Sequence, residues 1–168
     1  MAPLEEQRAF FAPPVVSRIA MISVHTSPLA QPGSGEAGGM NVYIRELSRN
    51  LAHRGVEVDI FTRRADPEQP PVVEADYGVR VFALEAGPLV PLPKDQLFCH
   101  LPEFVTELAF QINRDGRPYE LIHAHYWLSG WAGYLLKRYW DIPLVQMFHT
   151  LGDLKNLLSP KGSIEPVL

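Results

Sequence analysis

The sequence predicts an α/β protein built on a Rossmann-like, doubly wound and mostly parallel sheet. Two observations lead to this class. Short apolar runs typical of buried strands alternate along the chain with longer segments whose apolar residues recur at helical spacing. A glycine-rich stretch, residues 31–43 (QPGSGEAGGMNVY), lies between the first such strand and the first such helix. In folds of this class, a strand-to-helix junction of this kind can hold phosphate on the N-terminus of the helix.

The predicted elements follow one another from residue 18 onward. Residues 18–24 (RIAMISV) form a continuous apolar run, which is typical of a strand buried on both faces. A helix is predicted to start near Met40 and to end before Gly55, a common stop signal. The next elements are strands at 56–60 and 79–84, a helical region at 97–112 that Pro102 is expected to restart, a strand at 119–125, a helix at 129–140, a strand at 143–150 and the start of a helix at 153–158.

The strand at 56–60 has a different pattern from the others. Glu57 and Asp59 alternate with apolar residues, so we expect this strand to have one more exposed face. Two proline clusters, at 67–71 and 88–93, lie between periodic segments and are predicted to be connections. Strands that alternate with helices imply right-handed crossovers and a mostly parallel sheet.

Length and composition are typical of one globular domain. Of the 168 residues, we assign 1–17 to an N-terminal extension and 18–168 to the domain. The net charge of −4, without a basic cluster, argues against nucleic acid or an anionic membrane as partner. Cys99 is the single cysteine, which excludes an intrachain disulfide and favours a reducing compartment. No apolar run approaches the roughly 20 residues of a membrane span, and no signal-peptide core is present, so a cytoplasmic protein is predicted.

Three of the six histidines end predicted strands. His25 follows the first strand, His125 ends the strand at 119–125, and His149 lies near the end of the strand at 143–150. The carboxyl ends of parallel strands share one edge of a sheet, so we expect these side chains to meet beside the glycine-rich stretch. One such histidine would normally bond only to loop backbone, but three together favour a binding site. A zinc site is an alternative that the separated ligands and the absence of a carboxylate cluster disfavour.

The residue types near these histidines suit a sugar or a sugar phosphate. They offer hydroxyl groups, an amide, aromatic faces and one point charge for phosphate, on Thr26, Thr150, Asn41, Tyr126, Trp127 and Lys94. The glycine-rich stretch is not a Walker A motif, because no Gly-Lys-Ser/Thr follows it. It is also too long for the tight turn of the dinucleotide fingerprint, which leaves a phosphate cradle or a flexible surface loop.

Three ordered motifs resemble a known family. HTSPLAQPGSGEAGGMNVYI (25–44), HAHYWLSG (123–130) and FHTLGDLKN (148–156) are similar to the N-terminal domain of family-4 retaining glycosyltransferases, which have the two-domain GT-B fold. The likeness runs from about residue 18 to residue 156. Within the family, the chain resembles the enzymes that transfer N-acetylglucosamine to inositol 3-phosphate in mycothiol synthesis, and next the sucrose-phosphate synthases. The acceptor is therefore left between inositol phosphate and fructose phosphate.

The resemblance implies a donor side of the site. By position, Gly38 and Gly39 would lie against the diphosphate of the donor, and His149 would be the catalytic residue beside the transferred sugar. The co-substrate would be a nucleotide diphosphate-sugar such as a UDP-sugar. No metal or other cofactor is implied for the chemistry.

The resemblance also implies an acceptor side. His25 would line the cleft and Asn41 would contact the acceptor, while Lys94, Tyr126 and Thr150 would surround its phosphate. The donor-binding C-terminal domain of this fold is expected to be absent from the chain, so the chain alone is expected to be inactive. Pairing with a second copy of the chain is left open. The alternative is a stand-alone sugar-phosphate or nucleotide-binding module without catalysis.

Overall fold

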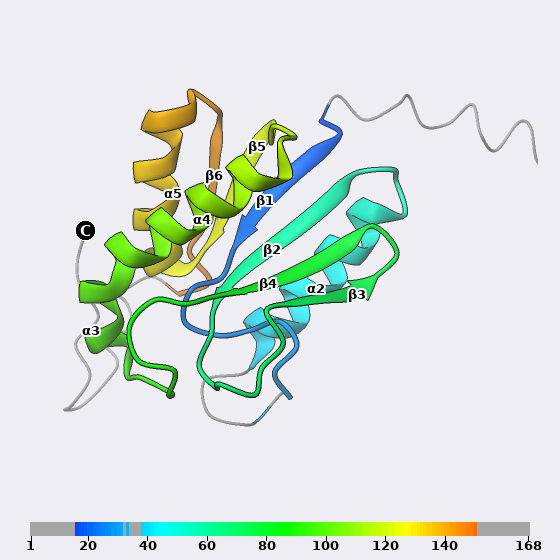
Figure 1. The fold of residues 1–168 in the computed structure, drawn as a ribbon. Coiled ribbons are helices and arrows are strands. Elements are labelled where there is room, and N and C mark those ends of the chain that lie inside the picture. The colour runs from blue at the N-terminus through cyan, green and yellow to red at the C-terminus, as the bar shows by residue number, and fades with distance from the viewer. Residues whose placement is uncertain (1–15, 32, 34–37, 151–168) are drawn as a thin grey trace, which may run out of the picture.

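A single six-stranded sheet organises the computed structural model, which describes residues 16–31, 33 and 38–150 (Figure 1). In the order β3-β4-β2-β1-β5-β6, neighbouring strands pair in parallel except for the antiparallel pair β3–β4. At the centre, Ile19 lies opposite Val58 on one side and Leu121 on the other. The strands are β1 (Arg18–Ile22), β2 (Glu57–Arg63), β3 (Val72–Asp76), β4 (Val79–Leu84), β5 (Leu121–His125) and β6 (Leu144–Met147). The predicted mostly parallel sheet is confirmed.

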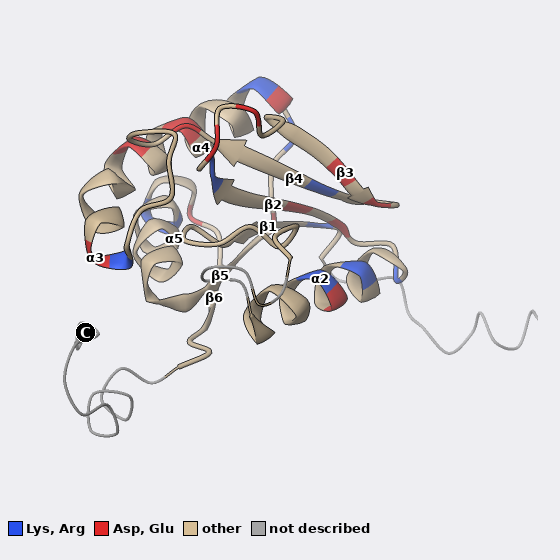
Figure 2. Ribbon diagram, turned by 90° about the horizontal axis from the view of Figure 1, so that it is seen from below, with Lys and Arg blue, Asp and Glu red and all other residues tan. Residues whose placement is uncertain are grey.

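Helices cover both faces of this sheet. One face carries α2 (Gly39–Ala52), and the other carries α4 (Leu101–Asp115) and α5 (Tyr126–Trp140), as the edge-on view in Figure 2 shows. The short helices α3 (Lys94–Leu97) and η1 (Phe98–His100) lead into α4, and Pro102 stands in the first turn of α4 as predicted. This two-sided cover is the doubly wound arrangement expected from the sequence.

The apolar run of β1 supplies both hydrophobic cores. Ile19 and Met21 point to the core under α2, whereas Ala20 and Ile22 point to the core under α4 and α5. All five residues of β1 are buried. Successive side chains of a strand alternate between faces, so a central strand covered on both sides needs the continuous apolar run that the sequence shows.

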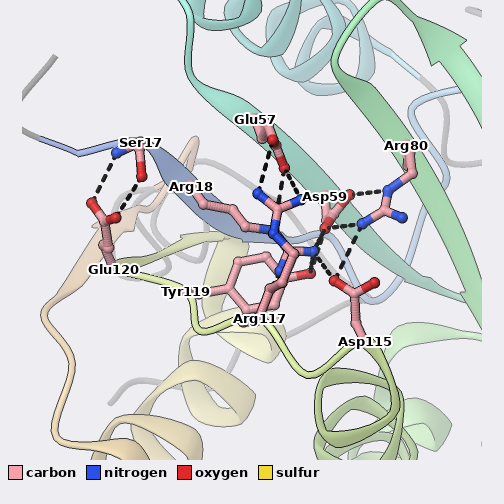
Figure 3. Close-up of polar contacts among 9 residues, drawn as sticks. All are labelled: Ser17, Arg18, Glu57, Asp59, Arg80, Asp115, Arg117, Tyr119 and Glu120. Atoms are coloured by element: carbon pink, nitrogen blue, oxygen red, sulfur yellow. Dashed lines mark hydrogen bonds and ion pairs between the residues drawn. The ribbon is translucent and has the colours of Figure 1, made fainter. Parts of the chain in front are cut away.

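The expectation of a more exposed face on β2 is wrong. Asp59 is only 2% exposed, because its carboxylate accepts hydrogen bonds from Arg18, Arg80 and the hydroxyl of Tyr119 (Figure 3). Arg18 also bonds to Asp115, which extends the network to the end of α4. A buried charge is tolerated when it is paired and hydrogen-bonded. The network lies at the amino ends of the strands, so it supports the sheet at the edge opposite the strand-end histidines.

Several element boundaries differ from the predictions. The edge strand β3 was not predicted, because it is mostly exposed and directly follows the proline cluster at 67–71. The predicted helix at 129–140 starts three residues earlier, and the predicted strand at 143–150 ends at Met147. The helix predicted from 153 and almost all of the N-terminal extension lie outside the described residues.

In the part of the chain that the structure describes, no helix is long and apolar enough to cross a membrane.

Candidate functional site

Two of the three strand-end histidines form a hydrogen-bonded pair. His125 is the last residue of β5 and is fully buried, and its Nδ1 lies 2.9 Å from Nε2 of His149. His149 lies in an exposed bend two residues past the end of β6. His25 packs instead against the ring of Tyr126, with 4.5 Å between the ring centroids. The structure therefore brings these histidines to one edge of the sheet in two adjoining groups.

Tyr126 is the centre of the second group. Besides His25, the ammonium group of Lys94 approaches its ring, 5.2 Å from the centroid. The carbonyl oxygen of Tyr126 accepts a hydrogen bond of 3.1 Å from Nε2 of Gln146, on the neighbouring strand β6. These contacts bring together three residues predicted to bind an acceptor, from the loop after β1, the start of α3 and the start of α5.

The backbone at this edge is strained. Among the described residues, the non-glycine residues with positive φ are Tyr126 at 72°, His149 at 59° and Asp141 at 52°. Asp141 is the left-handed cap at the end of α5, an ordinary place for such a conformation. The other two belong to the candidate site. Residues held in this region cost about 1–3 kcal/mol and gather at functional sites.

Arg63 anchors the loop that carries Lys94. Its buried guanidinium donates hydrogen bonds to the carbonyl oxygens of Pro88 (2.7 Å), Val90 (2.5 Å) and Ala86 (3.4 Å). Burial lowers the pKa of Arg63, but an arginine remains charged at neutral pH. No sequence pattern indicates this role, because the partners of Arg63 are main-chain atoms more than 20 residues away.

A cleft of about 480 Å³ opens between this loop, the loop after β1 and strands β3 and β4. Its volume falls within the range of small-molecule sites, about 300–1,000 Å³. Most of its wall is apolar, and the polar side chains that line it are His25, Thr26, Ser27, Arg63, Asp66 and Gln69. His25 thus belongs both to the cleft and to the group around Tyr126, which makes the two continuous.

Asn41 joins the loop after β1 to the start of α2. Its Nδ2 donates to Oγ1 of Thr26 (2.7 Å) and to the carbonyl oxygen of Ser27 (2.6 Å), while its Oδ1 accepts from the N–H of Gly38 (2.9 Å). Asn41 is 1% exposed. This structural role was missed, and a direct contact of Asn41 with an acceptor stays a prediction.

Gly38 and Gly39 leave space over the N-terminus of α2. Apart from its chain neighbours and the backbone of α2, a Cβ atom built on either glycine would meet no described atom within 4 Å, and neither glycine has a positive φ. Packing and backbone conformation among the described residues therefore do not demand glycine here. The first N–H groups of a helix lack intrahelical partners and carry partial positive charge, so this space suits an anion. Residues 34–37 of the glycine-rich stretch lie outside the described residues.

His123, His125 and His149 are neutral at pH 7. Burial, and then the neighbouring rings of His123 and His149, lower the pKa of His125 to about 2. Burial also lowers the pKa of His149 and that of His123. Within residues 16–31, 33 and 38–150, no group of three His, Cys, Asp or Glu side chains is placed to hold a metal ion. Thr150 follows His149 in the same bend and is exposed.

With this geometry in place, comparison with known proteins gives the family. The family described as glycosyl transferase 4-like domain matches residues 38–166. This chain belongs to that family. The match includes α2, Lys94, Tyr126 and the His125–His149 pair, and it confirms the resemblance stated from the sequence motifs.

The chain matches about a third of the length of the glycosyltransferase relatives. It is 53% identical over 148 residues to a D-inositol 3-phosphate glycosyltransferase of Kineococcus radiotolerans, covering 88% of the chain and 34% of the relative. It is 51% identical over 148 residues to a protein of the same name from Corynebacterium diphtheriae, covering 88% and 35%. A solved structure of sucrose-phosphate synthase from Thermosynechococcus elongatus superposes with a TM-score of 0.81 at 41% identity, covering 86% and 36%. The chain therefore spans about a third of the length of these glycosyltransferases.

Proposed function

We propose that this chain is the acceptor-binding N-terminal part of a retaining glycosyltransferase. The complete enzyme transfers a sugar from a nucleotide diphosphate-sugar, such as a UDP-sugar, to a hydroxyl group of a small phosphorylated acceptor in the cytoplasm. Inositol 3-phosphate is the favoured acceptor, because relatives about half identical to the chain carry that acceptor in their names. Fructose phosphate is the second choice, from the structural likeness to sucrose-phosphate synthase.

The grouping of Lys94, Tyr126 and His25 beside the cleft is the observation that carries this proposal. Lys94 offers a positive charge for the acceptor phosphate, and its ammonium group lies 5.2 Å from the centroid of the Tyr126 ring. The ring of His25 lies between the Lys94–Tyr126 group and the cleft: its centroid is 4.5 Å from that of the Tyr126 ring, and His25 also lines the cleft. A phosphate at Lys94 would thus leave the polyhydroxylated ring of the acceptor beside the polar side chains of the cleft.

The N-terminus of α2 supports a role on the donor side. As the bond to the leaving diphosphate breaks, negative charge grows on its oxygens and positive charge on the sugar ring. Preorganised N–H groups near Gly38 and Gly39 would stabilise that departing charge. His149 would orient the transferred sugar, and the partner domain of the complete enzyme would hold the nucleotide.

A binding titration tests the acceptor. The chain is titrated with inositol 3-phosphate, fructose 6-phosphate and unphosphorylated inositol, followed by the fluorescence of Trp127, Trp131 and Trp140. We expect saturable binding of a phosphorylated ligand and little binding of inositol. Lys94→Met should weaken the phosphorylated ligand about 10- to 100-fold, since a charge-assisted contact is worth about 1.5–3 kcal/mol.

Lys137→Met is the matched control, because Lys137 is an exposed lysine near the end of α5. It should leave the affinity unchanged. Equal binding of inositol and its phosphate, or equal loss in the two lysine variants, would contradict the proposal. In the complete enzyme, His149→Ala should strongly lower kcat. The free energy of unfolding should change little, because His149 lies in an exposed bend.

A further inference from the structure

The His125–His149 pair connects the interior of the domain to its surface. His125 is fully buried at the end of β5, whereas His149 is exposed in the bend after β6. We infer that His125 is a positioning residue, which fixes the ring orientation of His149 and holds it in the tautomer that carries its proton on Nδ1. The hydrogen bond of 2.9 Å between His125 Nδ1 and His149 Nε2 is the contact through which it acts.

Aromatic contacts hold the pair from both sides. The ring of His123 lies against that of His125, with 4.3 Å between centroids. Tyr43, on α2, presents its ring edge-on to His149 at 5.3 Å. The backbone of His149 is held at a positive φ, a conformation that persists only where the surroundings determine it. His125 on β5 and Tyr43 on α2 therefore both contact the imidazole ring of His149 in the bend after β6.

Burial of His125 decides the direction of the hydrogen bond. Both rings are neutral at pH 7, so one of the two facing nitrogens donates and the other accepts. His125 Nε2 is buried and has no hydrogen-bond partner among the described residues. A proton there would be a buried donor without an acceptor, and in the protein backbone such donors are rarer than acceptors without a donor.

The favoured arrangement therefore places the proton of His125 on Nδ1. His125 then donates to Nε2 of His149, and His149 carries its own proton on Nδ1. The tautomer of a histidine is set in this way by the bond that its other nitrogen makes. If His149 faces the transferred sugar, as the proposed function holds, its Nδ1–H presents a donor suited to a hydroxyl or ring oxygen of that sugar.

Nuclear magnetic resonance on the chain itself tests the tautomer without any substrate. With the histidine rings labelled with ¹⁵N, long-range ¹H–¹⁵N spectra at pH 7 show which nitrogen of each ring carries the proton. We expect the Nδ1–H form for His149 and its loss in His125→Phe. In His125→Asn, the amide N–H can replace the Nδ1 donor, so the Nδ1–H form should return. An Nε2–H form of His149 in the unaltered chain, or no change in His125→Phe, would overturn the inference.

Kinetics of the complete enzyme test the consequence. We expect His125→Phe to lower kcat about 10- to 100-fold through misplacement of His149, with a much smaller change in KM for the acceptor. His125→Asn should recover most of kcat even if both variants lose similar thermal stability. Equal kcat in the two variants would leave His125 a merely structural residue and overturn the inference. If the unaltered enzyme transfers no sugar, the proposed function fails, while the tautomer measurement still decides the positioning role.

Discussion

The guanidinium of Arg63 donates a hydrogen bond of 2.7 Å to the carbonyl oxygen of Pro88, across the gap between the end of β2 and the loop that leads to Lys94. A second bond, to the carbonyl oxygen of Val90, holds the same loop two residues closer to Lys94 along the chain. The position of the Lys94 ammonium group beside the ring of Tyr126 thus depends on an arginine at the end of β2. The binding site and the packing of the sheet are coupled through this residue.

Arg63→Ala should therefore weaken both the fold and the binding of inositol 3-phosphate. Loss of charge-assisted bonds to buried carbonyls should lower the free energy of unfolding by about 2–4 kcal/mol, measured by urea denaturation. Ligand affinity should fall about tenfold, and Arg63→Lys should restore little of it, since a lysine keeps the charge but not the planar set of donors.

Arg64→Ala is the control for this prediction. Arg64 follows Arg63 directly, but its guanidinium bonds at the surface to Glu85 and to the carbonyl oxygen of Pro67. Arg64→Ala should lower the free energy of unfolding by about 1 kcal/mol or less and leave the affinity for inositol 3-phosphate unchanged. Similar losses of affinity in the Arg63 and Arg64 variants would show that the loop is not held by Arg63.

Asn41→Ala should destabilise the domain through the start of α2. The side chain is buried and bonds to Thr26, Ser27 and Gly38, so its removal leaves several buried polar groups unpaired. We expect a loss of about 2–3 kcal/mol in thermal or urea unfolding. Asn50→Ala, on the exposed face of the same helix, should change stability by less than about 0.5 kcal/mol. Equal effects of the two substitutions would contradict the structural role of Asn41.

Asp59 should make the stability of the domain depend on acid pH. Burial alone would raise the pKa of Asp59, but hydrogen bonds from Arg80, Tyr119 and Arg18 outweigh burial and leave the pKa lowered. A carboxylate with a lowered folded-state pKa contributes stability that is present above its unfolded pKa, about 3.9, and is lost as pH falls through the folded value. We expect the free energy of unfolding to fall below about pH 4.

Comparison of unfolding curves from pH 7 to pH 3 checks this dependence. Asp59→Asn should cost about 3 kcal/mol at pH 7, and its difference from the unaltered chain should narrow toward pH 3. For Asp95→Asn, at the exposed start of α3, the difference in free energy of unfolding from the unaltered chain should instead stay constant from pH 7 to pH 3. A constant difference across the pH range for Asp59→Asn would show that its charge does not provide the stabilisation.

The elements of the fold were predictable where burial alone sets the pattern. The strand β1 is buried on both faces and shows a continuous apolar run, and α2 has its apolar residues on one side. The edge strand β3 was not predictable in this way, because it is exposed and its partner β4 comes after it along the chain. Asp59 was misread for a related reason. Its neighbour Arg80 lies directly beside it across the β2–β4 pair, and that register is not visible in the sequence.

The position of the candidate site was predictable, and its internal contacts were not. Parallel topology alone places His25, His125 and His149 at one edge of the sheet. Which of them meet depends on the bend after β6, where His149 takes a positive φ and turns to His125. That bend, like the anchoring of a loop by Arg63, depends on tertiary contacts that composition and periodicity do not contain.

Gly87 provides a test of how tightly the loop before Lys94 is built. It has a φ of +69°, and a Cβ atom there would lie 2.5 Å from two atoms of the His100 ring. Gly116 at the end of α4 has a similar φ of +66°, and an added Cβ there would have no described atom within 4 Å apart from its chain neighbours. Gly116→Ala should therefore cost only the backbone penalty, about 1–2 kcal/mol, in urea unfolding. Gly87→Ala should cost about 1–3 kcal/mol more, because the ring must move.

The double variant Gly87→Ala/His100→Ala separates the two contributions. With the ring removed, the cost of Gly87→Ala measured against His100→Ala alone should fall to that of Gly116→Ala. Gly87 lies between the carbonyl groups of Ala86 and Pro88 that bond to Arg63, so its distortion should also weaken inositol 3-phosphate binding. If Gly87→Ala and Gly116→Ala cost the same, the loop yields to the added methyl group, and Arg63 alone cannot hold Lys94 in place.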